Sequence, residues 1–170
     1  MGMKDAIKAL NALVARDVIK EYAIGGGTAA LAYLEPVVTF DVDVFVVFTD
    51  TERFDILSPV YSVLKNDFGA TFDAAHPETI TVCGVALQFL EAKDGLLSDA
   101  CKSAKVIDYD GVPARIFSAE HLIAICVSVG RPKDRQRVGM FYAAKAYDPT
   151  LLNLILDKYG LLEKWNSWIV

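Results

Sequence analysis

The stretch from 37 to 48, "VVTFDVDVFVVF", constrains the fold more than any other part of this sequence. It is β-branched or aromatic apart from two aspartates, which predicts a strand that is central in a sheet and covered on both faces. Asp41 and Asp43 interrupt this apolar run. A carboxylate in a low-dielectric environment is costly unless a positive group pairs with it, so the pattern requires a cationic partner.

The spacing of the two aspartates indicates what that partner is. Residues two apart on a strand point to the same face, so Asp41 and Asp43 are expected side by side, with Val42 and Val44 facing the opposite layer. Carboxylate oxygens, together with phosphate oxygens and water, are the ligands that Mg²⁺ prefers. The pair therefore predicts a site for Mg²⁺, or for Mn²⁺ in its place.

Length and patterning predict an α/β (α+β) protein with a mixed sheet flanked by helices. The chain has 170 residues, of which 54% are hydrophobic, enough for one well-buried compact unit. Within it, residues 1–117 are expected to form the α/β core and residues 118–170 to add C-terminal helices packed on that core. The order of elements is helix, strand, helix, strand, helix, strands, then helices.

The expected elements follow from periodicity and from capping and turn residues. They are a helix over 4–20, a strand over 22–24, a helix over 28–34 ended by Pro36, the strand 37–48, a helix starting at Thr49 or at Ser58-Pro59 and ended by Gly69, strands over 79–83 and 85–91, a hairpin turning at Asp110-Gly111, and helices from Ser118 onward interrupted at 130–132 and 148–149.

Composition bears on whether the protein binds nucleic acid, spans a membrane or is secreted. The net charge of −5 argues against nucleic-acid binding over the whole surface but leaves room for a local basic patch. Apolar runs are too short for a membrane span, and the charged, helical start is unlike a signal peptide, so a cytoplasmic protein is expected. The three cysteines, Cys83, Cys101 and Cys126, have no metal-binding or redox spacing and are expected to be free buried thiols.

A glycine turn precedes the aspartate strand. Gly25, Gly26 and Gly27 are followed by Thr28 at the start of a predicted helix. Backbone N–H groups there can approach a phosphate closely, and the Thr28 hydroxyl can add a hydrogen bond. Such turns also serve tight packing alone. Beside a metal-binding carboxylate pair, however, a phosphate-binding turn is typical of phosphoryl or nucleotidyl transfer.

Gly25-Gly26, Thr28 and then Thr39-x-Asp41-x-Asp43 resemble the nucleotidyltransferase signature of the DNA polymerase beta superfamily. Within it, the chain is most similar to small prokaryotic members, the AbiEii-like and related minimal nucleotidyltransferases. The resemblance implies that Asp41 and Asp43 bind Mg²⁺ and act in catalysis. It also implies that the glycine turn, Thr28 and Thr39 hold a nucleoside triphosphate.

The sequence departs from the family at two positions. Where the resemblance places a third carboxylate, on a neighbouring strand, this chain has Gln88, and an amide is no general base. Glu91 is nearest, but its odd offset from Gln88 turns it to the other face of a regular strand. Related members often have an arginine at the position of Val37.

The segment "GRPKDRQRVG", 130–139, concentrates cations in an otherwise acidic chain. Pro132 suits the first turn of a helix. One interpretation is a solvated helix start whose charges pair with Asp134. The other is a phosphate-contacting edge of the active site, and since the Lys133-Asp134 pair resembles a motif of the abortive-infection type, Lys133 is the predicted nucleotide contact.

Three functions remain open from the sequence. The first is an enzyme that transfers a nucleoside monophosphate from a nucleoside triphosphate to a hydroxyl on RNA, protein or a small molecule. The second is a catalytically impaired nucleotidyltransferase fold that binds nucleotide or a partner protein, for example within a toxin–antitoxin pair, as Gln88 favours. The third is a structural α/β protein whose aspartates pair internally with Lys or Arg.

Overall fold

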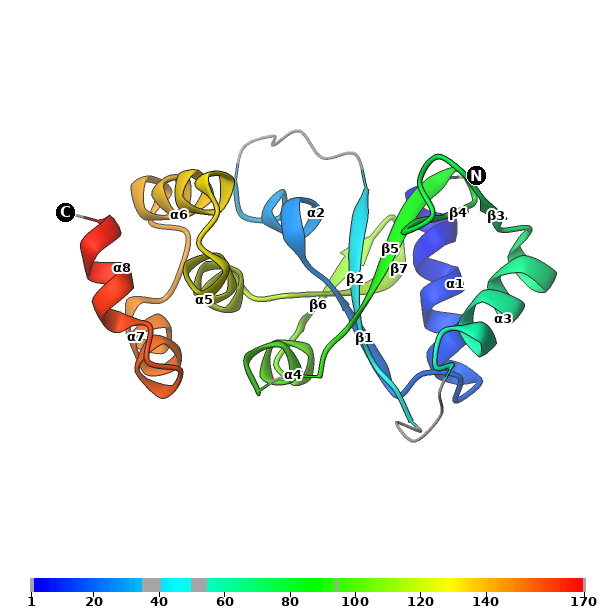
Figure 1. The fold of residues 1–170 in the computed structure, drawn as a ribbon, viewed down its shortest axis with the longest axis horizontal. Helices are drawn as coiled ribbons and strands as arrows, with labels where there is room; N and C mark the ends of the chain where they lie inside the picture. The colour runs from blue at the N-terminus through cyan, green and yellow to red at the C-terminus, as the bar shows by residue number, and fades with distance from the viewer. Residues whose placement is uncertain (1, 35–40, 50–54, 94, 170) are drawn as a thin grey trace.

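A computed structural model of the chain describes residues 2–34, 41–49, 55–93 and 95–169. One mixed sheet of seven strands, in the order β3-β4-β5-β2-β1-β7-β6, lies between helices (Figure 1). The strands are β1 (Glu21–Ile24), β2 (Val42–Val47), β3 (Thr71–Phe72), β4 (Ile80–Val82), β5 (Val85–Glu91), β6 (Lys105–Tyr109) and β7 (Val112–Ile116). The helices are α1 (Met3–Ala15), α2 (Gly26–Ala30), α3 (Ser58–Phe68), α4 (Gly95–Lys102), α5 (Ala119–Val129), α6 (Pro132–Ala144), α7 (Pro149–Lys158) and α8 (Leu162–Trp168).

The aspartate strand is central, as predicted. β2 is the fourth of the seven strands, antiparallel to β1 and parallel to β5. Val42, Val44 and Val46 are buried, whereas the alternate residues are only half-buried. The period of two therefore separates an apolar face from the face that bears Asp43. Residues 37–40 of the predicted strand lie outside the described residues.

Helices cover the two faces of the sheet. α1 and α3 pack together over one face, and α2, α4 and α5 lie over the other (Figure 1). α6 and α7 pack on α5, and α8 packs on α7, so the C-terminal helices extend the structure away from the sheet. Residue 117, the predicted division of the chain, lies between β7 and α5; the division itself stays a prediction. None of the helices in the described ranges is long and apolar enough to cross a lipid bilayer.

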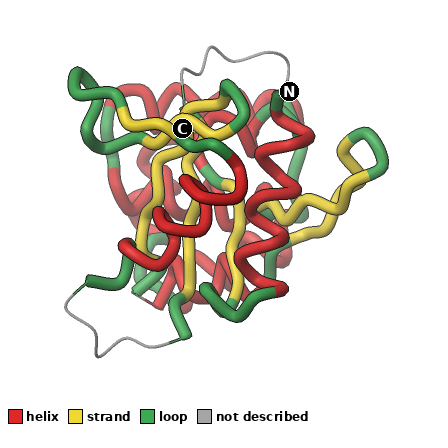
Figure 2. Tube along the Cα trace, turned by 90° about the vertical axis from the view of Figure 1, so that its right-hand side faces the viewer, coloured by secondary structure: helices red, strands yellow, loops and turns green. Residues whose placement is uncertain are grey.

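Turn and capping residues set most element boundaries as predicted. Asp110 and Gly111 both have positive φ, 50° and 81°, in the tight turn between β6 and β7, whose outer strand forms one edge of the sheet (Figure 2). Gly69, with φ 61°, ends α3. The Ser118 side chain accepts a hydrogen bond from the His121 N–H and so caps α5.

Two predicted helices end earlier in the structure, and one helix of the structure was not predicted. α1 ends at Ala15 because Asp17 adopts a left-handed φ of 55° and the Val18 N–H bonds back to the Leu13 carbonyl. α2 ends at Ala30, before the predicted end at residue 34. The sequence did not predict α4, because its eight residues give too short a window for helical periodicity.

Arg115 joins two neighbouring strands to a helix. From β7, its Nε donates to the Tyr22 carbonyl of β1 at 2.9 Å, and its Nη2 donates to the Cys101 carbonyl of α4 at 2.7 Å. A third bond reaches the Glu21 carboxylate at 3.3 Å. Since these acceptors lie on β1 and α4, one side chain of β7 links α4 to the sheet.

Replacing Arg115 with methionine is expected to lower the free energy of unfolding by about 2–3 kcal/mol, because part-buried acceptors lose a charged donor. Urea denaturation followed by circular dichroism measures the change. The matched control is Arg16→Met, since Arg16 pairs with Asp67 at the surface and its loss is expected to cost less than about 1 kcal/mol. Equal effects of the two substitutions would contradict this role of Arg115.

Candidate active site

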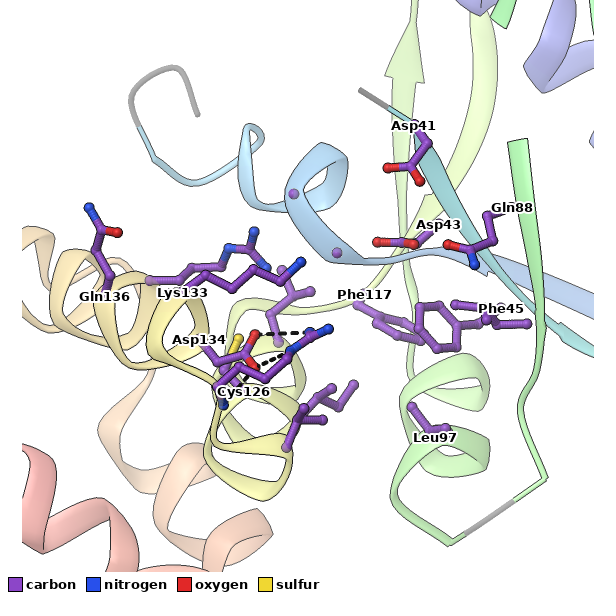
Figure 3. A pocket seen from close by; sticks show the side chains of 18 of the residues that line it. Asp41, Asp43, Phe45, Gln88, Leu97, Phe117, Cys126, Lys133, Asp134 and Gln136 are labelled. Carbon is purple, nitrogen blue, oxygen red and sulfur yellow. Dashed lines mark hydrogen bonds and ion pairs between the residues drawn. The ribbon is translucent and has the colours of Figure 1, made fainter. Parts of the chain in front are cut away.

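A cavity of about 740 Å³ lies between the sheet and the helices α5 and α6 (Figure 3). β2, β5 and the start of α2 form one wall, α5 and α6 form the opposite wall, and α4 contributes Leu97. The cavity thus lies on the side of the sheet to which Asp43 points. The C-terminal helices are needed to close it.

Asp41 and Asp43 form a carboxylate wall. Both are half-buried and line the cavity. Asp43 belongs to β2, and Asp41 directly precedes that strand. Figure 3 shows both side chains on the sheet side of the cavity, facing α6. Burial raises the pKa of the Asp43 carboxyl, and the negative charge of Asp41 raises it further, while Lys133, Arg137 and Arg131 oppose the rise. The site therefore favours a positive ligand beside Asp43.

The glycine turn brings backbone against this wall. The Gly25 N–H donates to the Asp43 carbonyl at 2.9 Å, which continues the pairing of β1 with β2. Gly26 has φ +56°, and a Cβ atom there would lie 1.7 Å from Oδ2 of Asp43. Only glycine fits this position, for conformation and for space. Gly26 and Gly27 line the cavity, and Gly25 is not among the lining residues.

Of the two threonines in the predicted site, Thr28 and Thr39, the structure describes only Thr28. The Thr28 hydroxyl donates to the Asp41 carbonyl at 3.3 Å, and Thr28 is not among the cavity-lining residues. Thr28 therefore positions the backbone at Asp41, and a direct contact with phosphate stays a prediction. Thr39 lies outside the described residues.

Gln88 occupies the position beside the carboxylates. In the parallel register of β2 and β5 it lies opposite Asp43, and it lines the cavity (Figure 3). Glu91 lies opposite Val46, and its carboxylate is 3.9 Å from Lys93 Nζ. It is not among the cavity-lining residues, as its odd offset predicted. An amide, not a third acid, therefore borders the carboxylate wall.

Two carboxylates suit one hard divalent cation whose remaining ligands come from substrate phosphates and water. The described residues contain no cluster of three or more acidic, histidine or cysteine side chains that would bind a metal ion without a substrate. The donor set of Asp41 and Asp43 thus fits Mg²⁺ or Mn²⁺ as a partner of a bound phosphate compound.

Arg131, Lys133 and Arg137 form a cationic wall opposite the aspartates. Lys133 and Arg137 are four residues apart on α6 and so lie on one side of the helix, and all three line the cavity. Arg135 is not among the lining residues; its guanidinium lies 5.8 Å from the Trp168 ring. The sequence singled out Lys133, and the four-residue spacing was the signal that would have added Arg137.

Asp134 fixes the start of this wall. It is 1% exposed and accepts from Arg131 Nε at 2.7 Å, Nη2 at 3.2 Å and the backbone N–H at 3.1 Å. Burial alone would raise the pKa of Asp134, but the bonds from Arg131 hold it below its usual value. The predicted pairing with Asp134 is present for Arg131, whereas Lys133 and Arg137 line the cavity and their contact with phosphate stays a prediction.

One side of the cavity, next to the carboxylate wall, is apolar. Phe45 follows Asp43 by two residues on β2, and its ring lies 4.8 Å, centroid to centroid, from that of Phe117. Leu90 lies opposite Phe45 on β5, and Leu97 of α4 also lines this side. We call Phe45, Leu90, Leu97 and Phe117 the apolar floor. The sequence analysis did not identify it, although strand alternation places Phe45 on the face of Asp43.

Comparison with known proteins identifies the fold. The sequence matches no protein-family model, and no curated protein matches it significantly. Among solved structures it is similar to an antigenic nucleotidyltransferase-like protein from Paracoccidioides brasiliensis, with a TM-score of 0.57 and 16% identity over 96% of this chain and 91% of that one. It is also similar to ANT(2″)-Ia in complex with adenylyl-2″-tobramycin, with a TM-score of 0.53 and 16% identity over 97% of each chain. The chain has a nucleotidyltransferase-like fold.

Proposed function

We propose that this protein transfers a nucleoside monophosphate from a nucleoside triphosphate to a hydroxyl acceptor, with Mg²⁺ or Mn²⁺ as cofactor. The observation that supports the proposal is the placement of the carboxylate wall and the cationic wall on opposite sides of one cavity. Internal pairing of the aspartates with Lys or Arg, the third hypothesis from the sequence, does not by itself account for a cavity that both walls line.

A metal-bound nucleoside triphosphate matches this distribution of charge. Asp41 and Asp43 would hold the metal, whose chemistry is to neutralise charge on the transferred phosphoryl group. Lys133, Arg137 and Arg131 would receive the remaining phosphate charge. Arg137 supports this role, because its Nε atom is buried without a hydrogen-bond partner in the described part of the chain.

The reaction exchanges one phosphorus–oxygen bond for another. The acceptor oxygen forms a bond to the α-phosphorus, the bond from that phosphorus to pyrophosphate breaks, and the hydroxyl proton leaves to water. This chain positions the reactants with the glycine turn and the two walls, which is the main contribution of a protein to such transfers. The structure of ANT(2″)-Ia, which has a similar fold and was solved with adenylyl-2″-tobramycin, supports the proposal. An AbiEii-like subtype remains part of the proposal.

Gln88 favours a second candidate function, a nucleotide-binding module with little or no turnover. An amide opposite Asp43 neither accepts a proton nor adds charge for a second metal ion. Such a protein would retain metal-dependent nucleotide binding and act through a partner protein, for example within a toxin–antitoxin pair. Both candidate functions require metal-dependent nucleotide binding, but only the first requires turnover.

Each ribonucleoside triphosphate is to be tested by thermal melting with and without Mg²⁺ or Mn²⁺. Wild type is expected to melt about 5–10 °C higher near saturation, because a ligand of the folded state adds stability. The Asp41→Asn/Asp43→Asn double variant is expected to show no metal-dependent rise. Lys133→Ala is expected to reduce the rise, and Arg135→Ala, on the same helix but outside the cavity, is the matched control. A rise that persists in the double variant would refute the proposed site.

The raised pKa of Asp43 predicts a pH dependence in the ligand-free protein. Because the folded-state pKa exceeds the unfolded value, the charged carboxylate lowers stability at neutral pH, and this cost disappears as the pH falls through the folded-state pKa. Asp43→Asn is therefore expected to unfold at higher urea than wild type at pH 7, with the difference shrinking toward about pH 4. The exposed Asp157→Asn is the control. A constant difference across pH would contradict the burial argument.

Gln88→Glu separates the two candidate functions. A carboxylate at this position adds a general base, which typically contributes about 10²–10⁴ in rate. If wild type is impaired, the variant is expected to gain metal-dependent pyrophosphate release while its nucleotide affinity changes little. If wild type already turns over and the variant gains nothing, the impaired-module candidate is wrong. Gln136→Glu, at another cavity-lining position on α6, controls for added charge.

A further inference from the structure

The apolar floor has no role in binding metal or phosphate, yet it borders the reacting centre. Along β2 the side chains on one face change from Asp43 to Phe45, and on β5 from Gln88 to Leu90. Two residues of a strand span about 7 Å. An aromatic ligand whose hydroxyl group reaches the carboxylate wall can therefore place its ring near Phe45.

The aromatic part of the floor is held rigidly. A Cβ atom at Gly25 would lie 2.5 Å from Cε2 of Phe45 and 2.9 Å from Cε2 of Phe117, so both rings pack against the glycine turn. Phe117 is fully buried and supports Phe45, which is only half-buried and lines the cavity. In Figure 3 the two rings lie beneath Asp43 and Gln88, with Leu97 below them. A fixed ring beside apolar side chains favours a flat apolar ligand.

The position of the floor suits the acceptor of the transfer. In such reactions the attacking and leaving oxygens lie roughly in line at phosphorus. The cationic wall of α6 would attract the leaving pyrophosphate. The acceptor would therefore approach from the opposite side, which is the sheet. That side presents Phe45 and Leu90.

The charges of the described cavity-lining residues disfavour a polycationic acceptor. The acidic side chains among the described cavity-lining residues are those of Asp41, Asp43 and Asp134. A bound metal ion would be coordinated by Asp41 and Asp43, and Asp134 already pairs with Arg131. An aminoglycoside such as tobramycin carries several ammonium groups and would meet the cationic wall and the apolar floor. Both contacts are unfavourable.

Gln88 gives a second, independent argument, which concerns the pKa of the acceptor hydroxyl. Among the described residues that line the cavity, Asp41 and Asp43 would hold the metal ion and Asp134 is paired with Arg131. No other carboxylate or imidazole lines the cavity there to accept the hydroxyl proton. A phenol, with a pKa of about 10 like that of tyrosine, loses its proton far more readily than an aliphatic alcohol. A cavity whose described lining residues offer no free general base therefore favours a phenolic hydroxyl.

We propose that the acceptor is a phenolic compound, bound with its ring on the apolar floor and its hydroxyl at the carboxylate wall. This inference rests on the proposed function. The phenol oxygen bonds to the α-phosphorus, pyrophosphate leaves with the electrons of the broken bond, and the phenolic proton goes to water. The product is an aryl ester of a nucleoside monophosphate.

The probe for this subsite is 1-naphthol, whose binding is followed by its own fluorescence. Wild type is expected to bind it, and Leu97→Glu to weaken binding about tenfold or more, because a charge enters the floor. Leu154→Glu is the matched control, since Leu154 is 65% exposed on α7, and it is expected to leave binding unchanged. If Leu97→Glu fails to fold in a melting test, Leu97→Gln replaces it. Failure of wild type to bind, or equal binding by the variants, overturns the subsite.

Competition and product formation test the acceptor role. ATP with Mg²⁺ is expected to bind together with 1-naphthol, and naphthyl adenylate is expected by mass spectrometry, with none of the tobramycin adduct. Displacement of 1-naphthol by ATP would assign the floor to the nucleobase and overturn the inference. So would a tobramycin adduct, or no naphthyl adenylate with both ligands bound. If none of the four ribonucleoside triphosphates binds, the proposed function fails, whereas nucleotide binding without 1-naphthol binding refutes this inference alone.

Discussion

The close approach of the glycine turn to β2 is the constraint on which the site depends. Gly25 bonds to the Asp43 backbone, and Gly26 leaves no room for a Cβ atom beside the Asp43 carboxylate. This packing brings β1, the start of α2 and the central strand to one point at the cavity. Because the contact is made by backbone, the carboxylates and the N–H groups of the turn are set by the fold itself, and little reorganisation is needed when a ligand binds.

The two walls of the cavity hold opposite charges apart. Asp41 and Asp43 come from the centre of the sheet, whereas Lys133 and Arg137 come from a helix of the C-terminal part. The buried Asp134 holds Arg131 and thereby secures the first turn of that helix. The ligand proposed to bind between the walls has a metal ion at one end and anionic phosphates at the other. Its binding would also relieve the cost of the buried Asp43 charge.

Strand alternation and turn chemistry made much of the fold predictable. The Asp41-x-Asp43 spacing predicted a shared face, and Asp110-Gly111 and Ser118 predicted a hairpin and a helix start that the structure confirms. The apolar floor was not predictable to the same degree. Phe45 lies on the face of Asp43 by local rules, but Phe117 and Leu97 reach it from other elements, and α4 was too short to give a periodic signal.

The sequence by itself determined the local features: a central strand with two carboxylates on one face, a glycine turn before it, and a cationic helix start near residue 132. These follow from dihedral preferences and from the periods of strands and helices, which act over a few residues. The tertiary structure decided what these features face. Only the packing of α5 and α6 against the sheet side of β2 places Arg137 opposite Asp43 and closes the cavity over Phe45, because contacts between distant segments depend on how whole elements bury their apolar faces.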